Sequence, residues 1–453
     1  MRIANRVVLL ILPGCLCLAQ ATAQSGRVKD SDSDKPESRS AQRLYEEAHT
    51  YAERKFQEFK QKNVPYDAKL AMTIEGQQRE LATRDAGLLE SRTALTGEDF
   101  YYLGMLHHLG GNGDAALAAM RRFLTGNPVG EKAQLGRAVI VLYAVKKNLL
   151  PEAETMSAAY LENQPQDPLE HYGMESLLAD AYFKIKNYER MAIHAREMFA
   201  AARIVAGTRR VDVFKRDDML LKSATFLAEA LARQNQPERA GRAFQELRKE
   251  AISLPSGNLY KMANIRLATV DPNADFGLIF GEMTDMESRT PPEIAASQWI
   301  DQAPATLENL LGQVVLLDFW APWCEPCRYT LPKLQKWHEA YKEKGLVILG
   351  ITNYYGQADG KKLTQAEELA YLRNFKKKNR LPYGFVVADS SDNAINYGVF
   401  SIPMSFLIDK RGNVRFIAAG AGEAEITRLG KMIKKLLDEP ASPPGLSADQ
   451  GKK

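Results

Sequence analysis

The feature that most constrains this chain is an apolar strand that leads through a short loop to a pair of cysteines. Residues 314–319 (Val-Val-Leu-Leu-Asp-Phe) are typical of a buried strand, and a helical pattern runs from Glu325 to Lys344. Cys324 and Cys327 therefore stand at the start of a helix. Short β-branched runs alternate with helical segments from here to the C-terminus, which indicates an α/β fold with a largely parallel sheet.

The rest of this α/β region follows the same alternation. We expect strands at 346–352 and 385–388, a hairpin of 405–409 with 414–418, and helices at 363–378 and 423–437. The whole chain then divides into a signal peptide (1–23), a disordered linker (24–40), a helical domain (41–270), a second linker (271–290), the α/β domain (291–438) and a disordered tail (439–453).

The N-terminus has the pattern of a secretory signal. Arg2 and Arg6 precede an apolar stretch of about a dozen residues, and Ala21-Thr22-Ala23 forms a small-x-small cleavage site. The stretch is short for a membrane-spanning helix. We expect an exported protein, periplasmic or associated with the envelope. An uncleaved anchor and a lipoprotein, for which Leu12 to Cys15 loosely resembles a lipobox, stay open as alternatives.

Cysteine usage supports a redox function. The chain has four cysteines, and if Cys15 and Cys17 leave with the signal, only Cys324 and Cys327 stay. Disulfides form outside the cytoplasm, but a pair separated by two residues closes almost no loop and gains little as a structural crosslink. The pair is better suited to a disulfide that forms and breaks reversibly. The six histidines form no ligand pattern with the cysteines, so we expect no metal.

Residues 41–270 are predicted to be all-helical and repetitive. Four segments align as the second helices of successive helical pairs: 116–124, 153–161, 192–199 and 240–247. Each has a small residue followed by an aromatic residue or leucine, and glycine, asparagine or proline breaks the turn before it. The pattern resembles degenerate tetratricopeptide repeats. Such repeats imply a surface that binds a peptide or protein, with a plain helical spacer as the alternative. The net charge of +4 gives no reason to expect nucleic acid as a partner.

The motif Asp318-Phe319-Trp320-Ala321-Pro322-Trp323-Cys324-Glu325-Pro326-Cys327 resembles that of the thioredoxin superfamily, in particular the exported TlpA/ResA-like thiol–disulfide oxidoreductases. The resemblance covers about residues 291–438. At a helix N-terminus Cys324 is expected to be the nucleophilic thiolate. Cys327, one turn further, is expected to be the resolving thiol. The redox-active disulfide then needs no other cofactor.

The resemblance also assigns substrate contacts. Ile402-Pro403 matches the family's cis-proline, with Ile402 preceding it where the backbone receives a substrate strand. Trp323 is expected to shield the reactive sulfur and contact the partner, and Pro326 to lie at the same surface. Trp320 is expected to serve in packing.

Two carboxylates are expected to tune the chemistry. Asp318 matches the buried acid of thioredoxins that is proposed to relay a proton, with a locally satisfied strand-end aspartate as the alternative. Glu325 lies between the cysteines, where its charge opposes the helix dipole and favours a reducing couple. An insert at 353–362 follows the central strand. The TlpA/ResA branch carries an extra helix at this position, so the resemblance implies a helix here.

The partners implied are protein thiols and disulfides, a membrane electron donor, and a protein bound by the repeats. We expect the protein to act as a reductant. Two other functions are weighed against this one. A non-enzymatic envelope scaffold would use only the repeats. A peroxiredoxin-like peroxidase would need Thr or Ser three residues before the reactive cysteine, where this chain has Ala321.

Overall fold

The computed structural model describes residues 38–65, 67–271 and 290–440. The predicted signal peptide, most of both linkers and most of the tail lie outside these ranges. None of the described helices is both long and apolar enough to cross a membrane. The chain forms two compact units that divide between Ala201 and Ala202, inside α9 (Tyr188–Ala206). The domain boundaries expected from the sequence stay a prediction.

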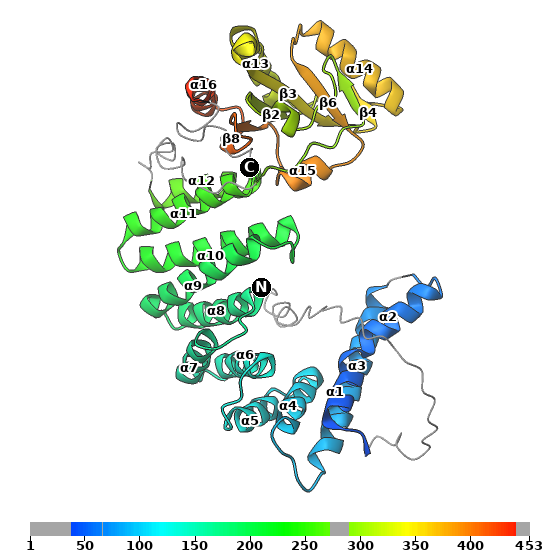
Figure 1. The fold of residues 1–453 in the computed structure, drawn as a ribbon, viewed down its shortest axis with the longest axis vertical. Coiled ribbons are helices and arrows are strands. Elements are labelled where there is room, and N and C mark those ends of the chain that lie inside the picture. Colours follow the sequence, from blue (N-terminus) through cyan, green and yellow to red (C-terminus); the bar gives the residue numbers. More distant parts are fainter. Residues whose placement is uncertain (1–37, 66, 272–289, 441–453) are drawn as a thin grey trace, which may run out of the picture. The chain divides into compact units, whose positions relative to one another are not determined.

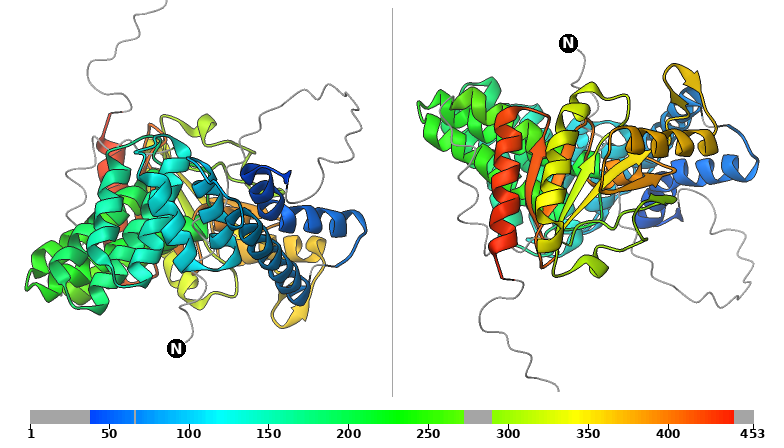
Figure 2. Two further views of the ribbon diagram at one scale, coloured as in Figure 1. Left: turned by 90° about the horizontal axis from the view of Figure 1, so that it is seen from below. Right: turned by 90° about the horizontal axis from the view of Figure 1, so that it is seen from above.

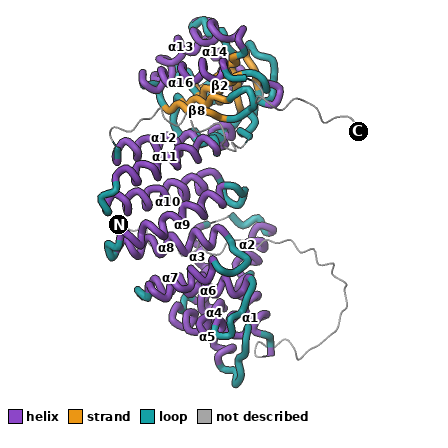
Figure 3. Tube along the Cα trace, turned by 60° about the vertical axis from the view of Figure 1, so that its left-hand side comes forward, coloured by secondary structure: helices purple, strands orange, loops and turns teal. Residues whose placement is uncertain are grey.

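The first unit is helical, as Figure 3 shows by its purple tube. Before α9, its helices are α1 (Ala41–His49), α2 (Tyr51–Gln61), α3 (Ala68–Glu90), α4 (Asp99–Gly110), α5 (Gly113–Leu124), α6 (Glu131–Lys146), α7 (Leu150–Leu161) and α8 (Pro168–Lys184). From α3 to α7, each helix packs against the next. The prediction of an all-helical N-terminal region is therefore confirmed.

The four predicted second helices lie within α5, α7, α9 and α11 (Pro237–Ser253). Their small residues are buried, as are the large residues that follow: Ala116, Ala153, Ala192, Ala240, Phe123, Tyr160, Phe199 and Leu247. Asn148 and Asn235, in the turns before α7 and α11, have positive φ angles of 59° and 58°. Asparagine tolerates this left-handed conformation, which is why it ends helices here. Assignment of these pairs to the tetratricopeptide family stays a prediction.

The second unit combines helices with a mixed sheet (Figure 1). Helices α10 (Val213–Arg233), α11 and α12 (Gly257–Val270) come first in the chain. The sheet has the order β1-β6-β3-β2-β7-β8. Its strands are β1 (Gln298–Ile300), β2 (Val314–Phe319), β3 (Leu346–Asn353), β6 (Gly384–Ala388), β7 (Met404–Ile408) and β8 (Val414–Ala419). Parallel pairing joins β2, β3 and β6, whereas β1, β7 and β8 run antiparallel to their neighbours.

Helices from different parts of the chain cover the two faces of this sheet. On one face, α13 (Glu325–Tyr341) and α16 (Glu423–Asp438) lie side by side (Figure 2, right), and their Leu334 and Ile433 belong to the same buried cluster as Leu407 of the sheet. Side chains alternate along a strand, so Phe406 points to the other face. There the backbone of Gly257 in α12 comes close to Phe406. The helices α10–α12 thus belong to the same packed unit as the sheet, with α11 and α12 in contact with β8.

Most predicted elements of the α/β region agree with the structure, and three details differ. α13 ends at Tyr341, followed by a 3-10 turn at 342–344. The strand β1 and the short helix α15 (Asp392–Asn396) were not predicted. The helix implied for the insert 353–362 is wrong.

The insert instead forms a hairpin of β4 (Gln357–Ala358) and β5 (Lys361–Lys362) before α14 (Gln365–Lys378). Its two turn residues, Asp359 and Gly360, both have positive φ. An Asp-Gly pair favours a tight hairpin turn over a helix, which accounts for the difference.

Candidate active site

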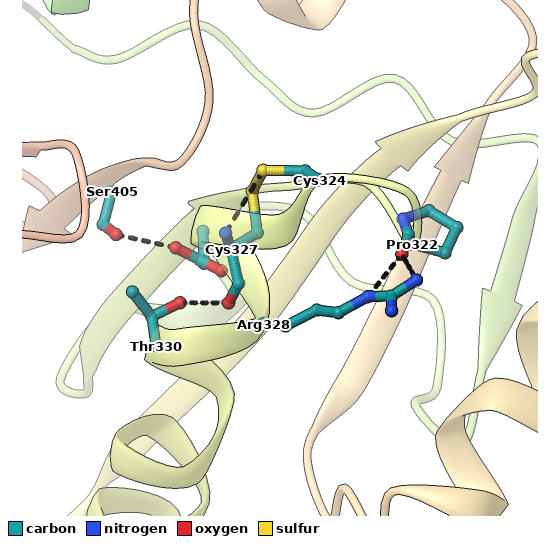
Figure 4. Close-up of a disulfide and its surroundings, with 7 residues drawn as sticks. Pro322, Cys324, Cys327, Arg328, Thr330 and Ser405 are labelled. Carbon is teal, nitrogen blue, oxygen red and sulfur yellow. Dashed lines mark hydrogen bonds between the residues drawn. A yellow bond between two sulfur atoms is a disulfide. The ribbon is translucent and has the colours of Figure 1, made fainter.

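Cys324 and Cys327 form a disulfide at the N-terminus of α13 (Figure 4). Cys324 is the N-cap residue, and its Sγ accepts a hydrogen bond from the Cys327 backbone N–H at 3.2 Å. Cys324 is 5% exposed, whereas Cys327 is completely buried. Of the two cysteines, Cys324 is therefore the one with some contact with solvent. After reduction, the unpaired N–H groups and the dipole of the helix favour a thiolate at this position.

The loop between β2 and α13 is held in place by side chains of the helix. The Arg328 guanidinium donates two hydrogen bonds to the Pro322 carbonyl, at 2.9 and 2.6 Å. The Thr330 hydroxyl donates to the Cys327 carbonyl at 2.8 Å (Figure 4). Charge-assisted bonds to one carbonyl fix the approach to Cys324. Nothing in the sequence pattern had singled out Arg328.

The other residues of the motif divide between surface and core. Trp323 is 57% exposed and packs edge-on against Tyr355, with ring centroids 5.3 Å apart. Glu325 and Pro326 are exposed on the first turn of α13. Trp320 is buried against Phe385. The first three are available to a partner, and Trp320 packs in the core.

Asp318 is a buried carboxyl group on β2, 1% exposed. The Ser405 hydroxyl, directly across on β7, donates to Asp318 Oδ1 at 2.7 Å. Asp318 Oδ2 has no hydrogen-bond partner among the described residues. Burial raises the pKa of Asp318 to about 7, although the bond from Ser405 acts in the opposite direction. A carboxyl group that titrates near neutral pH is able to exchange a proton under ordinary conditions.

The Ile402–Pro403 peptide bond is cis. The segment 397–403, called the cis-proline loop below, leads into β7. Together with the motif it lines a groove of about 230 Å³. Trp323 and Tyr355 line this groove together with Phe400 and Ile402 of the cis-proline loop. The backbone of Ile402 makes no hydrogen bond within residues 38–65, 67–271 and 290–440. An extended peptide in the groove would meet free main-chain groups there.

Sequence reasoning missed several residues of this site. Tyr355 lies in the insert, and Phe400 lies in a loop without periodicity. Ser405 faces Asp318 only because of the antiparallel register of β2 with β7, which no local pattern reveals. No group of three or more His, Cys, Asp or Glu side chains suited to a metal occurs in the described part of the chain.

Comparison with known proteins agrees with this geometry. Residues 290–417 match the AhpC/TSA family. Over 130 residues the chain is 32% identical to the thiol-disulfide oxidoreductase ResA of Bacillus anthracis, covering 29% of this chain and 67% of that protein. Protein DipZ of Mycobacterium tuberculosis is 30% identical over 150 residues, covering 32% of this chain but only 20% of DipZ. A putative thiol:disulfide interchange protein DsbE from Chlorobium tepidum is 26% identical, with a TM-score of 0.27, covering 33% of this chain and 95% of that one.

A disulfide at the N-terminus of a helix, next to a cis-proline loop on a mixed sheet, defines a thioredoxin-like oxidoreductase. More narrowly, the chain belongs to the thiol–disulfide oxidoreductases of the ResA type.

Proposed function

We propose that this enzyme works outside the cytoplasm and exchanges the Cys324–Cys327 pair with protein substrates, as a reductant. The observation that carries the proposal is the position of Cys324, the more exposed cysteine of the pair, directly after Trp323, which lines the groove of the cis-proline loop. The N-terminal Arg2–Ala23 segment supports export. The helical region supports a protein partner, because stacked helical pairs present extended binding surfaces. A reductant needs a source of electrons, for which we propose a membrane donor.

The exchange begins with the dithiol form. The Cys324 thiolate attacks a substrate disulfide, forms a mixed disulfide, and releases one substrate thiolate that takes up a proton. Cys327 then loses its proton, attacks Cys324 Sγ, and releases the second substrate thiol. Two electrons have passed from the cysteine pair to the substrate. The pair, now a disulfide, needs a dithiol donor to return to its starting state.

Asp318 is proposed to assist the second step. Its carboxyl group is buried on β2, the strand that leads into the cysteine motif, where water competes little for a proton. With a pKa of about 7, it takes the proton of the Cys327 thiol and returns it later. Glu325 is exposed at the first turn of α13. Its negative charge is proposed to destabilise the Cys324 thiolate, which lowers the reduction potential of the pair and favours its action as a reductant.

The reduction potential of the pair tests this proposal directly. The full chain is equilibrated with dithiothreitol or glutathione buffers, and the free thiols are counted by alkylation. Thioredoxin-like couples span roughly −270 to −120 mV. We expect a value towards the reducing end of that range. Cys327→Ser should accumulate a mixed disulfide with a protein substrate, and Cys324→Ser should form none. A pair that never forms a disulfide would refute the proposal.

The peroxidase alternative has one test of its own. Ala321, three residues before Cys324, is buried and has no hydroxyl group to hold a peroxide. Rapid consumption of hydrogen peroxide by the reduced chain would favour that function instead. The scaffold alternative would be favoured if the double variant Cys324→Ser, Cys327→Ser kept the full biological role.

A further inference from the structure

The cis-proline loop is held by helices that lie outside the family match at 290–417. The Gly257 N–H donates to the Tyr397 carbonyl at 2.9 Å, and the Asn258 N–H donates to the Gly398 carbonyl at 2.7 Å. Both N–H groups belong to the first turn of α12, where a helix has no internal acceptor for them. The loop therefore completes the N-terminus of α12, and α12 fixes the backbone of the loop.

Side chains of α10 and α12 strengthen this junction. The N-cap residue of α12, Ser256, is completely buried and donates from Oγ to Asp217 Oδ2 on α10 at 2.5 Å. Lys261 Nζ donates to Ser401 Oγ at 2.9 Å. Ser401 is the residue before Ile402, so the anchoring extends to the position that faces the substrate groove.

One contact of this junction is open to solvent. Phe214 on α10 stacks on Phe400 of the loop, with ring centroids 4.8 Å apart and planes 10° from parallel. The two side chains are 53% and 45% exposed. Phe400 also lines the groove, as Trp323 does. Neighbouring large aromatic side chains that stay exposed are characteristic of an interaction surface.

We infer that α10 is part of the substrate-binding site. Phe214 and Phe400 extend the groove beside Cys324, and the extended site takes an unfolded or extended polypeptide with an aromatic or large aliphatic side chain close to its reacting cysteine. This inference rests on the proposed exchange with protein substrates. The lining is mostly apolar, carries no charged side chain and includes the free backbone at Ile402, so it favours a polypeptide over a small charged thiol.

Matched peptides test the inference on the full chain. Two short peptides differ only in a Phe or Ser beside a single cysteine, which is carried as a mixed disulfide with glutathione. The reduced protein should show a higher kcat/KM for the Phe peptide. Phe214→Ala should lower the Phe-to-Ser ratio of kcat/KM by about fivefold, the size expected for losing one aromatic contact. Phe214→Tyr should keep the ratio.

Two controls separate recognition from damage to the fold. Phe183→Ala removes a phenylalanine of α8 that is 40% exposed, and it should leave the ratio unchanged. The reduction potential of Phe214→Ala should match that of the parent, which shows that the cysteine pair and its surroundings are intact. An unchanged ratio in Phe214→Ala, or no preference in the parent, would overturn the inference while leaving the proposed function intact. A parent that reduces neither peptide would instead overturn the proposed function.

Discussion

The buried carboxyl group of Asp318 couples stability to pH. Its pKa in the folded state, about 7, lies above its ordinary value of 3.8 because of burial. Between these values the folded chain binds the proton more tightly than the unfolded chain does. The contribution of Asp318 to stability is thus most favourable below pH 4, declines as pH rises, and levels off above pH 7.

Asp318→Asn should remove this dependence while keeping an acceptor for Ser405. From pH 5 to pH 8 the oxidised parent should lose about 2–3 kcal/mol of unfolding free energy relative to the variant. Urea unfolding followed by tryptophan fluorescence measures the difference. All four tryptophans lie between residues 299 and 337, so the signal reports the α/β region alone. A difference that stays constant with pH would contradict the prediction.

The charge of Glu325 should set part of the reduction potential. Glu325→Gln removes a negative charge beside Cys324, so the thiolate and the reduced form become more favourable and the potential rises. A charge at a helix N-terminus is worth about 0.3–1 kcal/mol. For two electrons this is roughly 6–21 mV. Glu343→Gln, at a side chain that is 88% exposed beyond α13, is the matched control and should leave the potential unchanged.

At the scale of elements, the tight junction between α12 and the cis-proline loop should be sensitive to one added carbon. Gly398 has a φ of 55°, and a Cβ placed there would lie 2.6 Å from Ser256 Oγ and 3.3 Å from Ser256 Cα. Ser256 is anchored to Asp217 and has no room to move. Gly398→Ala should therefore cost about 1–3 kcal/mol of unfolding free energy from overpacking, in addition to the strain of a positive φ.

Gly356→Ala separates the two effects. Gly356 has a similar φ of 68°, but a Cβ there would meet nothing within 4 Å. The difference between the two variants in urea unfolding isolates the contact with Ser256. Equal losses would show that strain alone accounts for the cost at Gly398. Because the loop carries Ile402, Gly398→Ala should also raise KM for peptide substrates.

The same junction shows where sequence reasoning succeeded and where it failed. The strand 314–319, the helix after it and the cysteine pair follow from local patterns, since periodicity and capping depend on near neighbours in the chain. The partnership of α12 with the cis-proline loop joins residues about 140 positions apart, as Lys261 and Ser401 do. No periodicity records such a contact. The Asp-Gly turn of the insert is a local signal in the sequence, and the helix expected from the family resemblance took no account of it.

At the scale of the whole molecule, the compact unit that holds the active site is larger than the domain found by similarity. It begins at Ala202 and includes α10–α12, whereas the family match begins at residue 290. Met404 and Phe406 on β7 lie against Gly257, and Phe416 on β8 packs against Tyr260. A fragment that starts at residue 290 would expose these side chains to water.

The fragment 290–440 should therefore be less stable than the fragment 202–440, by at least about 3 kcal/mol if two large apolar side chains lose their cover. It should also lose preference among peptide substrates, because α12 no longer fixes the cis-proline loop. Tryptophan-monitored urea unfolding compares the two fragments on the same signal, since both contain all four tryptophans. If 290–440 matched 202–440 in both stability and selectivity, α10–α12 would contribute neither to the stability of the α/β region nor to the binding of substrates. The active site would then lie wholly within residues 290–440.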